Sequence, residues 1–306
     1  MTTPANTPTY TNVPAGMSRL KLNFDEGAGT SPGKTVYIKV PSGSKRVGMR
    51  WDEGHVSPPD GNTLPLFGVN SASWDDINTA LGGIKTWRAY NTPGQSVPGH
   101  YPGTGTVPPN TIPIVSIKPN IPDLLAGKLD TALANYIKQI PHGSYFTAWH
   151  EGETNDGWTA PQIVACHAYM LSHVKANNAA VNYCQIFGNY FMQHSQGGPQ
   201  WVGLGLPFYF MDGYGSSDKD DFDSIFAPTA KIIEGVAPGA KLGITEINHH
   251  TVGDRAAFFT NCYAGAKANN YVTFTPFYST GQGIPWLTSD TASIAALTKI
   301  NEDTKS

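Results

Sequence analysis

The sequence predicts an α/β protein, a (β/α)8 TIM barrel with a small N-terminal β-rich extension. Short apolar runs recur eight times after residue 60. Stretches with helical periodicity lie between most of them, and the runs start about 30 residues apart, which is the spacing of strand–helix units. Eight such units in about 240 residues match this barrel in length and rhythm.

The first predicted domain covers residues 1–60, and the barrel covers residues 61–306. Residues 1–16 are rich in Thr, Pro and Asn and predict an irregular arm. Three stretches with period-two alternation follow, separated by Gly- and Pro-rich clusters, and they predict a small antiparallel β element. Their apolar residues are Leu20, Leu22 and Phe24, then Val36, Ile38 and Val40, then Val47, Met49 and Trp51.

The barrel strands are expected at the eight apolar runs, and the helices at the periodic stretches between them. The strand runs are 64–70, 84–90, 112–118, 144–150, 181–187, 207–213, 242–248 and 271–277. The helical stretches are 71–81, 121–140, 159–178, 222–236, 253–270 and 289–304, whereas 188–206 shows the least helical periodicity. Thr159 and Pro161 are typical of the start of a helix.

An open, doubly wound sheet is the main alternative to the barrel. Neither the GxGxxG fingerprint of dinucleotide-binding folds nor the phosphate-binding GxxxxGK[ST] loop occurs in the sequence. The Gly-x-Gly at 203–205 precedes a strand and lacks the third glycine. The sequence therefore argues against nucleotide binding.

Composition excludes several further classes of protein. The net charge is −3, from 20 Lys and Arg against 23 Asp and Glu, which argues against a nucleic-acid-binding protein. The 40% hydrophobic content rules out a disordered chain. No apolar run approaches the length of a membrane span. The three cysteines, Cys166, Cys184 and Cys262, are expected as buried thiols rather than a disulfide framework.

Two glutamates stand out where a barrel of this type carries its active site, at the C-terminal ends of the strands. Glu151 and Glu246 each interrupt the end of an apolar run. A carboxylate beside a buried strand destabilises the fold unless something compensates. A pair of carboxyl groups flanking a bond is the equipment of glycoside hydrolysis, one as a proton donor and one as an ionised nucleophile or base. The structural alternative is that each caps a loop or pairs with Arg88.

Short motifs around these glutamates resemble a known group of enzymes. Trp149-His150-Glu151 and the TEIN of residues 245–248 resemble the catalytic strands of clan A glycoside hydrolases. His-Glu in the first motif is similar to glycoside hydrolase family 26, which contains β-mannanases and related endo-glycanases. Arg88 and the MDGY of residues 211–214 fit the arginine and tyrosine that contact the nucleophile in that clan. The resemblance covers roughly residues 62–304, although the loops are shorter here and GETNDGW at 152–158 matches only loosely.

The resemblance implies a role for each residue of the candidate site. Glu151 would be the acid/base and Glu246 the nucleophile of a retaining mechanism, with carboxyl groups about 5–5.5 Å apart. Arg88 and Tyr214 would keep Glu246 ionised, and His150 would orient Glu151 or bind sugar. The expected substrate contacts are Arg88, Trp149, His150, Glu153, Asp212, Tyr214, Asn248 and Trp286, with Trp149, Trp158, Tyr190 and Trp286 as candidate sugar platforms.

Other constellations give weaker hypotheses. Glu153 is the chief rival to Glu151 as the acid. His249 and His250 are adjacent rather than spaced as HxxxH or HExxH, so no metal is expected. No GxSxG nucleophile elbow occurs. The acidic run at 216–224 lacks the DxDxDG pattern of a calcium loop and predicts a solvated loop.

The sequence therefore predicts a retaining glycoside hydrolase that cleaves a β-linked polysaccharide or oligosaccharide. It is expected to be a monomer that needs no cofactor and binds neither nucleic acid nor membrane. Although the N-terminus lacks the features of a signal peptide, an extracellular or virion-associated location is favoured. The alternative is a non-catalytic carbohydrate-binding or structural barrel in a larger surface or virion assembly.

Overall fold

The computed structural model describes residues 64–305 except 72–73, 92–95, 104, 155–156, 195–196 and 279–289, together with the backbone of four short N-terminal strands. The chain divides into two compact units, Met1–His55 and Val56–Ser306. The domain boundary expected after residue 60 stays a prediction.

The N-terminal unit contains two antiparallel pairs of strands. Strand β1 (Thr9–Asn12) pairs with β4 (Arg46–Met49), and β2 (Arg19–Asn23) pairs with β3 (Thr35–Lys39). Strands β2, β3 and β4 lie in the three alternating stretches. Strand β1 corrects the expectation of a wholly irregular arm, because its sequence TYTN is rich in residues that favour strands.

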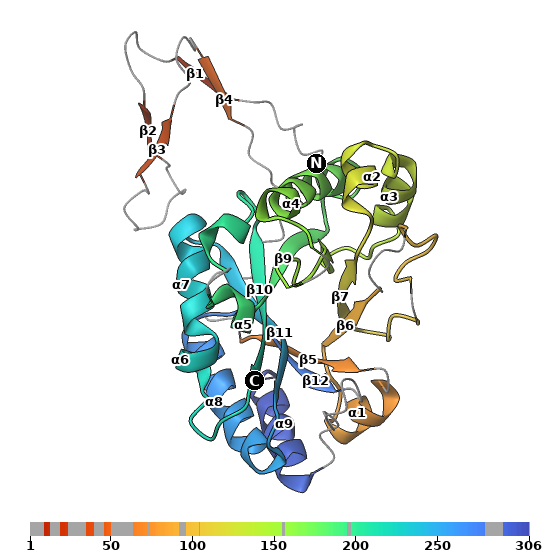
Figure 1. The fold of residues 1–306 in the computed structure, drawn as a ribbon, viewed down its shortest axis with the longest axis vertical. Coiled ribbons are helices and arrows are strands. Elements are labelled where there is room, and N and C mark those ends of the chain that lie inside the picture. The colour runs from red at the N-terminus through yellow and green to blue at the C-terminus, as the bar shows by residue number, and fades with distance from the viewer. Residues whose placement is uncertain are drawn as a thin grey trace, which may run out of the picture. The chain divides into compact units, whose positions relative to one another are not determined.

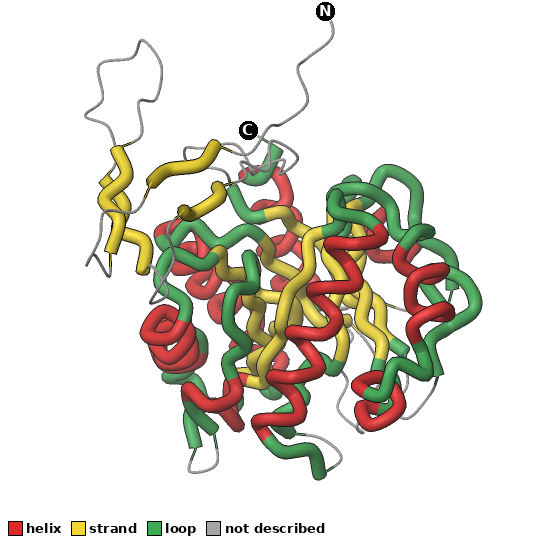
Figure 2. The backbone as a smooth tube through the Cα atoms, turned by 90° about the horizontal axis from the view of Figure 1, so that it is seen from above, coloured by secondary structure: helices red, strands yellow, loops and turns green. Residues whose placement is uncertain are grey.

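The second unit is a closed barrel of eight parallel strands surrounded by helices (Figures 1 and 2). Each strand pairs with the next along the chain, and β12 pairs with β5 to close the barrel. All eight predicted strands are present, and the predicted TIM barrel is confirmed. The strands are β5 (Leu66–Ser71), β6 (Thr86–Tyr90), β7 (Ile112–Ile117), β8 (Tyr145–Ala148), β9 (Asn182–Gly188), β10 (Phe208–Gly215), β11 (Lys241–His249) and β12 (Thr273–Tyr278).

The helices follow the predicted stretches except for the short α5, which lies in 188–206, and two of the predicted stretches are split. Gly127 adopts a φ of +75° and separates α2 from α3, and Pro228 stands in the first turn of α7, directly after α6. Helix α4 begins after Thr159 as predicted, and the Thr159 amide donates to Gln162 Oε1 at 2.9 Å. The helices are α1 (Trp74–Ala80), α2 (Ile121–Leu125), α3 (Asp130–Ile137), α4 (Ala160–Asn177), α5 (Asn189–Met192), α6 (Phe222–Ile225), α7 (Ala227–Val236), α8 (Arg255–Ala268) and α9 (Thr291–Asp303).

Two apolar layers form the core of the barrel unit. The larger one joins the outward faces of the strands to the helices and contains Cys166 and Cys262. Cys184 belongs to the smaller layer, and all three cysteines are buried and free. The smaller one fills the barrel interior, where Tyr145 packs edge-on against Phe208 and Phe210 with ring centroids 5.2 and 5.0 Å apart. This aromatic plug closes the interior beneath the polar side chains at the C-terminal ends of the strands.

Strand β11 contains an irregularity at the point where it reaches these polar side chains. Ile244 pairs with Met211, but the next pair is Glu246 with Asp212, so Thr245 is an extra residue. Ile244 and Ile247 both belong to the outer core although they are three residues apart, which strict alternation does not allow. The bulge therefore turns both Thr245 and Glu246 toward the interior.

The end of the chain is tied to the loop that precedes β6. Asn301 Nδ2 donates to the carbonyl oxygens of Leu81 at 2.6 Å and Gly83 at 2.8 Å. Lys305 Nζ donates to the carbonyl oxygen of Gly82 at 2.6 Å. Helix α9 thereby fastens the last strand–helix unit to the first. No helix within the described ranges is long and apolar enough to cross a membrane.

Candidate active site

Glu246 lies at the centre of a set of donors from three other strands. Its Oε1 accepts a hydrogen bond from Asn70 Nδ2 of β5 at 2.9 Å, and its Oε2 accepts one from the Tyr214 hydroxyl of β10 at 2.6 Å. Arg88 Nη2 of β6 lies 3.9 Å from Oε1. Arg88 is in turn held by Ser116, whose Oγ accepts from Nη1 at 2.6 Å. The carboxylate is thus fixed in orientation.

The proton affinity of Glu246 reflects two opposing effects. Burial raises the pKa of Glu246 above its ordinary value. The charge of Arg88 and the hydrogen bonds from Tyr214 and Asn70 act in the other direction and favour the ionised form. These partners therefore counteract the desolvation that a buried carboxylate otherwise suffers.

Glu151 stands in the turn that follows β8, and the backbone of this turn is unusual. Trp149 has a φ of 54° and Glu151 a φ of 50°, both in the left-handed region that non-glycine residues rarely adopt. The Glu151 amide donates to the Ile186 carbonyl at 2.8 Å, and its own carbonyl accepts from the Thr154 amide at 3.0 Å. These bonds hold the turn against the end of β9.

The pKa of Glu151 is raised to about 7, first by burial and then by the negative charge of Glu246. The positive charges of Lys118 and Arg88 oppose that rise. A carboxyl group with a pKa near 7 holds its proton in mildly acidic solution and can release it to a reacting oxygen. Glu151 and Glu246 therefore influence each other, as two groups of one site.

Two further carboxyl groups adjoin this pair. Glu153 accepts a hydrogen bond from the Gly188 amide, and burial raises its pKa to about 8. Asp212 accepts from the Thr245 hydroxyl at 2.6 Å, whereas its Oδ2 is buried and finds no partner among the described residues. Burial, followed by the charges of Glu246 and Glu151, raises the pKa of Asp212 well above its ordinary value.

An aromatic and cationic group lies beside Glu246 and Glu151. The rings of His150 and Tyr90 have centroids 5.0 Å apart, and the Arg88 guanidinium carbon lies 5.4 Å from the Tyr90 centroid. Burial, aided by Arg88 and Lys118, lowers the pKa of His150 well below its ordinary value, so the imidazole is neutral at pH 7. The Tyr90 side chain is 40% exposed and faces the mouth of the barrel.

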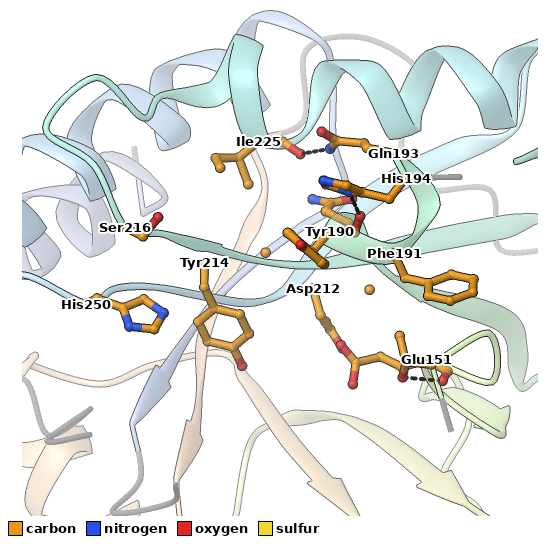
Figure 3. A pocket seen from close by; sticks show the side chains of 14 residues that line it. Glu151, Tyr190, Phe191, Gln193, His194, Asp212, Tyr214, Ser216, Ile225 and His250 are labelled. Carbon is orange, nitrogen blue, oxygen red and sulfur yellow. Dashed lines mark hydrogen bonds between the residues drawn. The ribbon is translucent and has the colours of Figure 1, made fainter. Parts of the chain in front are cut away.

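A cavity of about 640 Å³ opens beside the carboxyl groups. Figure 3 shows Glu151, Asp212 and Tyr214 along one side of it, with Ile225 and Gln193 on the other. The remaining residues that line it are Thr154, Gly188, Asn189, Tyr190, Phe191, His194, Gly213, Ser216 and His250. Its size is within the range of small-ligand sites.

The structure brings together seven of the predicted residues: Arg88, His150, Glu151, Glu153, Asp212, Tyr214 and Glu246. Trp149 is only 2% exposed, and its indole N–H donates to the Pro119 carbonyl at 2.7 Å. Asn248 is fully buried and donates to the Phe277 carbonyl at 2.7 Å. Direct contacts of Trp149 and Asn248 with a sugar stay a prediction, and neither side chain presents an exposed surface for such a contact. Trp286 lies outside the described residues.

Sequence reasoning gave no role to five residues that the structure adds to the site. Asn70 and Tyr90 end apolar runs, so the rule that identified Glu151 and Glu246 also points to them, and the same rule places Asn189 at the end of the fifth strand. Ser116 and Thr245 act on Arg88 and Asp212, and nothing in the sequence signals these pairings. Over the part of the chain that the structure describes, no group of three or more His, Cys, Asp or Glu side chains is arranged to hold a metal ion.

Fold and site together define a TIM barrel with a cluster of carboxyl groups at the C-terminal mouth. No protein-family model matches the chain, and no curated protein matches it. Solved structures do match, at low sequence identity, and they confirm the fold that the family 26 resemblance implies.

Three of these structures show the extent of the likeness. A glucosidase from Croceicoccus marinus has a TM-score of 0.55 and 13% identity, with 80% of this chain and 69% of that chain covered. A family 26 endo-β-1,4-mannanase from Cellulomonas fimi has a TM-score of 0.54 and 14% identity, over 78% and 70%. A family 128 endo-β-1,3-glucanase from Amycolatopsis mediterranei has a TM-score of 0.53 and 14% identity, over 77% and 98%.

Proposed function

We propose that this protein is a retaining glycoside hydrolase that cleaves a β-linked polysaccharide, with Glu151 as the acid/base and Glu246 as the nucleophile. One observation carries the proposal: two carboxyl groups at one barrel mouth have different environments. Glu246 receives donors that favour its ionised form. Glu151 has a pKa of about 7 and is protonated in mildly acidic solution. A proton donor paired with an ionised nucleophile is what glycoside hydrolysis requires.

In the first step, Glu246 attacks the anomeric carbon while Glu151 transfers its proton to the glycosidic oxygen. The carbon–oxygen bond breaks, the leaving sugar departs with a new hydroxyl, and a glycosyl ester forms on Glu246. In the second step, Glu151 accepts a proton from a water molecule while the oxygen of that water attacks the anomeric carbon. The bond between this carbon and Glu246 breaks, and Glu246 is released as a carboxylate. The product keeps the β configuration.

The electrostatic coupling of the two glutamates supports this sequence of steps. The charge of Glu246 is one reason that the pKa of Glu151 is raised. That charge disappears when Glu246 becomes an ester, so the pKa of Glu151 falls after the first step. The lower pKa favours the carboxylate form, which is the form that accepts a proton from water.

The substrate class rests on the resemblance and on the cavity. The motifs at residues 149–151 and 245–248 are similar to those of enzymes that cleave β-mannans and related glycans. The cavity beside Glu151 is lined by aromatic and polar side chains, which suits a sugar ring with its apolar faces and hydroxyl edges. A β-linked glycan is therefore the favoured substrate.

The deciding experiment replaces the nucleophile. Glu246→Ala is expected to lower the hydrolysis of mannan, laminarin, xylan or glucan, whichever the wild type cleaves, by about 1,000-fold or more. Added azide should restore part of the turnover and give a product of inverted configuration, because the small anion occupies the space of the lost carboxylate. Glu234→Ala, which removes an exposed carboxylate from α7, is the matched control and should keep full activity.

The melting temperature of the same preparations separates chemistry from folding. Full activity in a well-folded Glu246→Ala protein would overturn the mechanism. Binding of a glycan by the wild type without any turnover would instead favour a carbohydrate-binding barrel.

A further inference from the structure

The cavity lies on one particular side of the proposed catalytic pair. It is lined by Glu151 and by residues that end or follow β9, β10 and β11, whereas Glu246 is not among its lining residues. The partners Asn70 and Arg88 of Glu246 come from β5 and β6, on the other side of the barrel mouth. Because the acid protonates the glycosidic oxygen, the sugar that leaves must lie on the side of Glu151.

An exposed aromatic ring stands in this cavity and is held in place. Tyr190 belongs to α5, directly after β9, and is 79% exposed. Its ring stacks on the ring of His194, with centroids 4.0 Å apart and planes 27° apart. His194 Nδ1 also lies at hydrogen-bonding distance from the Tyr190 carbonyl. Figure 3 shows this pair at the wall of the cavity. An exposed ring fixed in this way offers a flat apolar surface at little entropic cost.

The neighbouring residue adds a polar group without a protein partner. Asn189 is 2% exposed and lines the cavity, and neither its Oδ1 nor its Nδ2 finds a partner among the described residues. Gly213 makes room for it, since a Cβ there would come within 2.8 Å of Asn189 Nδ2. A buried amide without partners destabilises the fold unless a ligand satisfies it. Its donor and acceptor lie side by side, as do the hydroxyls of a sugar ring.

We propose that Tyr190 and Asn189 form the subsite for the sugar on the leaving-group side of the bond that is cleaved. Tyr190 stacks on an apolar face of that sugar, and Asn189 turns its amide to the hydroxyls at the ring edge. This inference rests on the proposed function, because Glu151 defines which side is the leaving-group side. It makes an oligosaccharide, rather than a glycoside with a small leaving group, the preferred substrate.

The test compares substrates that place a sugar on the leaving-group side with substrates that do not. β-1,4-Mannohexaose and β-1,3-laminarihexaose fill the subsite, whereas mannobiosyl and laminaribiosyl β-fluorides leave it empty because fluoride is the leaving group. Tyr190→Ala is expected to lower kcat/KM for the hexaose that the wild type cleaves by about tenfold more than for the matching fluoride. Asn189→Ala should act in the same direction, and Tyr190→Phe should keep most of the hexaose activity.

Leu204→Ala is the control, because Leu204 is 70% exposed and does not line the cavity. It should leave both substrates unaffected. An equal loss on hexaose and fluoride in Tyr190→Ala, or no loss on either, overturns the subsite and leaves the proposed hydrolase intact.

A binding measurement separates failure of the subsite from failure of the proposed function. Both hexaoses are titrated calorimetrically into Glu246→Gln protein, with and without Tyr190→Ala. A Kd that rises at least fivefold supports the subsite, even where the wild type shows no hydrolysis and the proposed function has therefore failed. An unchanged Kd, or no binding of either hexaose, overturns the subsite.

Discussion

Glu151 and Glu246 are the same amino acid at one barrel mouth, yet their surroundings differ: Glu246 is buried and Glu151 is half-buried. Glu246 contacts a cation and two neutral donors. Glu151 stands in a strained turn where burial and the charge of Glu246 both disfavour a second negative charge. This difference in surroundings is what the proposed division into acid and nucleophile requires of two carboxyl groups.

Replacing the acid gives a prediction that depends on the leaving group. Glu151→Gln keeps the shape of the side chain but cannot donate the proton. We expect kcat/KM for oligosaccharides to fall by about 100-fold or more and that for dinitrophenyl glycosides by less than about tenfold, because dinitrophenolate leaves without protonation. Equal losses on the two substrates would remove Glu151 from the acid role. The same two substrates measured with Glu153→Gln test whether Glu153 is the acid instead of Glu151.

The pH dependence of kcat/KM follows from the same two groups. Activity should fall above pH 7, where Glu151 loses its proton, and also in acid, where Glu246 gains one. Because the charge of Arg88 lowers the pKa of Glu246 strongly and that of Glu151 more weakly, Arg88→Met should move the acid limb to higher pH and the alkaline limb by less in the same direction. A flat profile between pH 4 and 8, or an acid limb that Arg88→Met does not move, would contradict this assignment.

At the scale of elements, the sequence predicts the strands but not the local backbone irregularities that orient the side chains of the site. The eight strands follow from apolar runs, since a buried strand needs such a run wherever it lies. The extra residue Thr245 in β11 and the left-handed turn at Trp149 and Glu151 have no counterpart in the pattern, because both depend on pairing with distant strands. For the same reason the sequence shows Glu246 but not its contact with Asn70.

The junction of β9 and α5 provides a steric test of the acid's position. A Cβ on Gly188 would lie 3.0 Å from Glu151 Oε1 and 3.4 Å from Glu153 Oε1. The backbone of Gly188 is extended, so Gly188→Ala introduces no backbone strain and acts by displacing these carboxyl groups and the Thr154 methyl group, which would lie 3.3 Å from the Cβ. We expect kcat/KM to fall roughly 10–100-fold, with little change in melting temperature.

Gly235→Ala is the matched control for this change. Gly235 lies in α7, and outside that helix no atom lies within 4 Å of the place that a Cβ would take. The variant should therefore keep full activity and gain slightly in stability, because alanine favours a helix more than glycine does. Unchanged kinetics in Gly188→Ala would show that Glu151 does not need its present position.

At the scale of the whole molecule, the buried carboxyl groups make folding dependent on pH. Glu151, Glu153 and Asp212 have pKa values above those of an unfolded chain, so the folded protein binds more protons than the unfolded one between about pH 4.5 and 8. The contribution of these groups to the free energy of unfolding is therefore largest in acid. It is lost as the pH rises through their pKa values in the folded protein.

Glu153→Gln isolates one of these groups. It keeps the oxygen that accepts from the Gly188 amide and removes the group that ionises. At pH 8 the variant should melt about 2–6 °C higher than the wild type, and at pH 5 the difference should shrink. Thermal unfolding followed by circular dichroism at both pH values measures this. A variant that is destabilised equally at pH 5 and pH 8 would contradict a raised pKa for Glu153.

The bonds from Asn301 to the loop before β6 join residues that are 220 and 218 positions apart in the chain. During synthesis from the N-terminus, β5 emerges long before β12, its partner at the closure of the barrel. Until then β5 and the most recently made strand present open edges, which are templates for pairing with other chains. A nascent chain therefore remains vulnerable to aggregation until its last strand–helix unit has left the ribosome, and chaperones that cover strand edges should matter most during that interval.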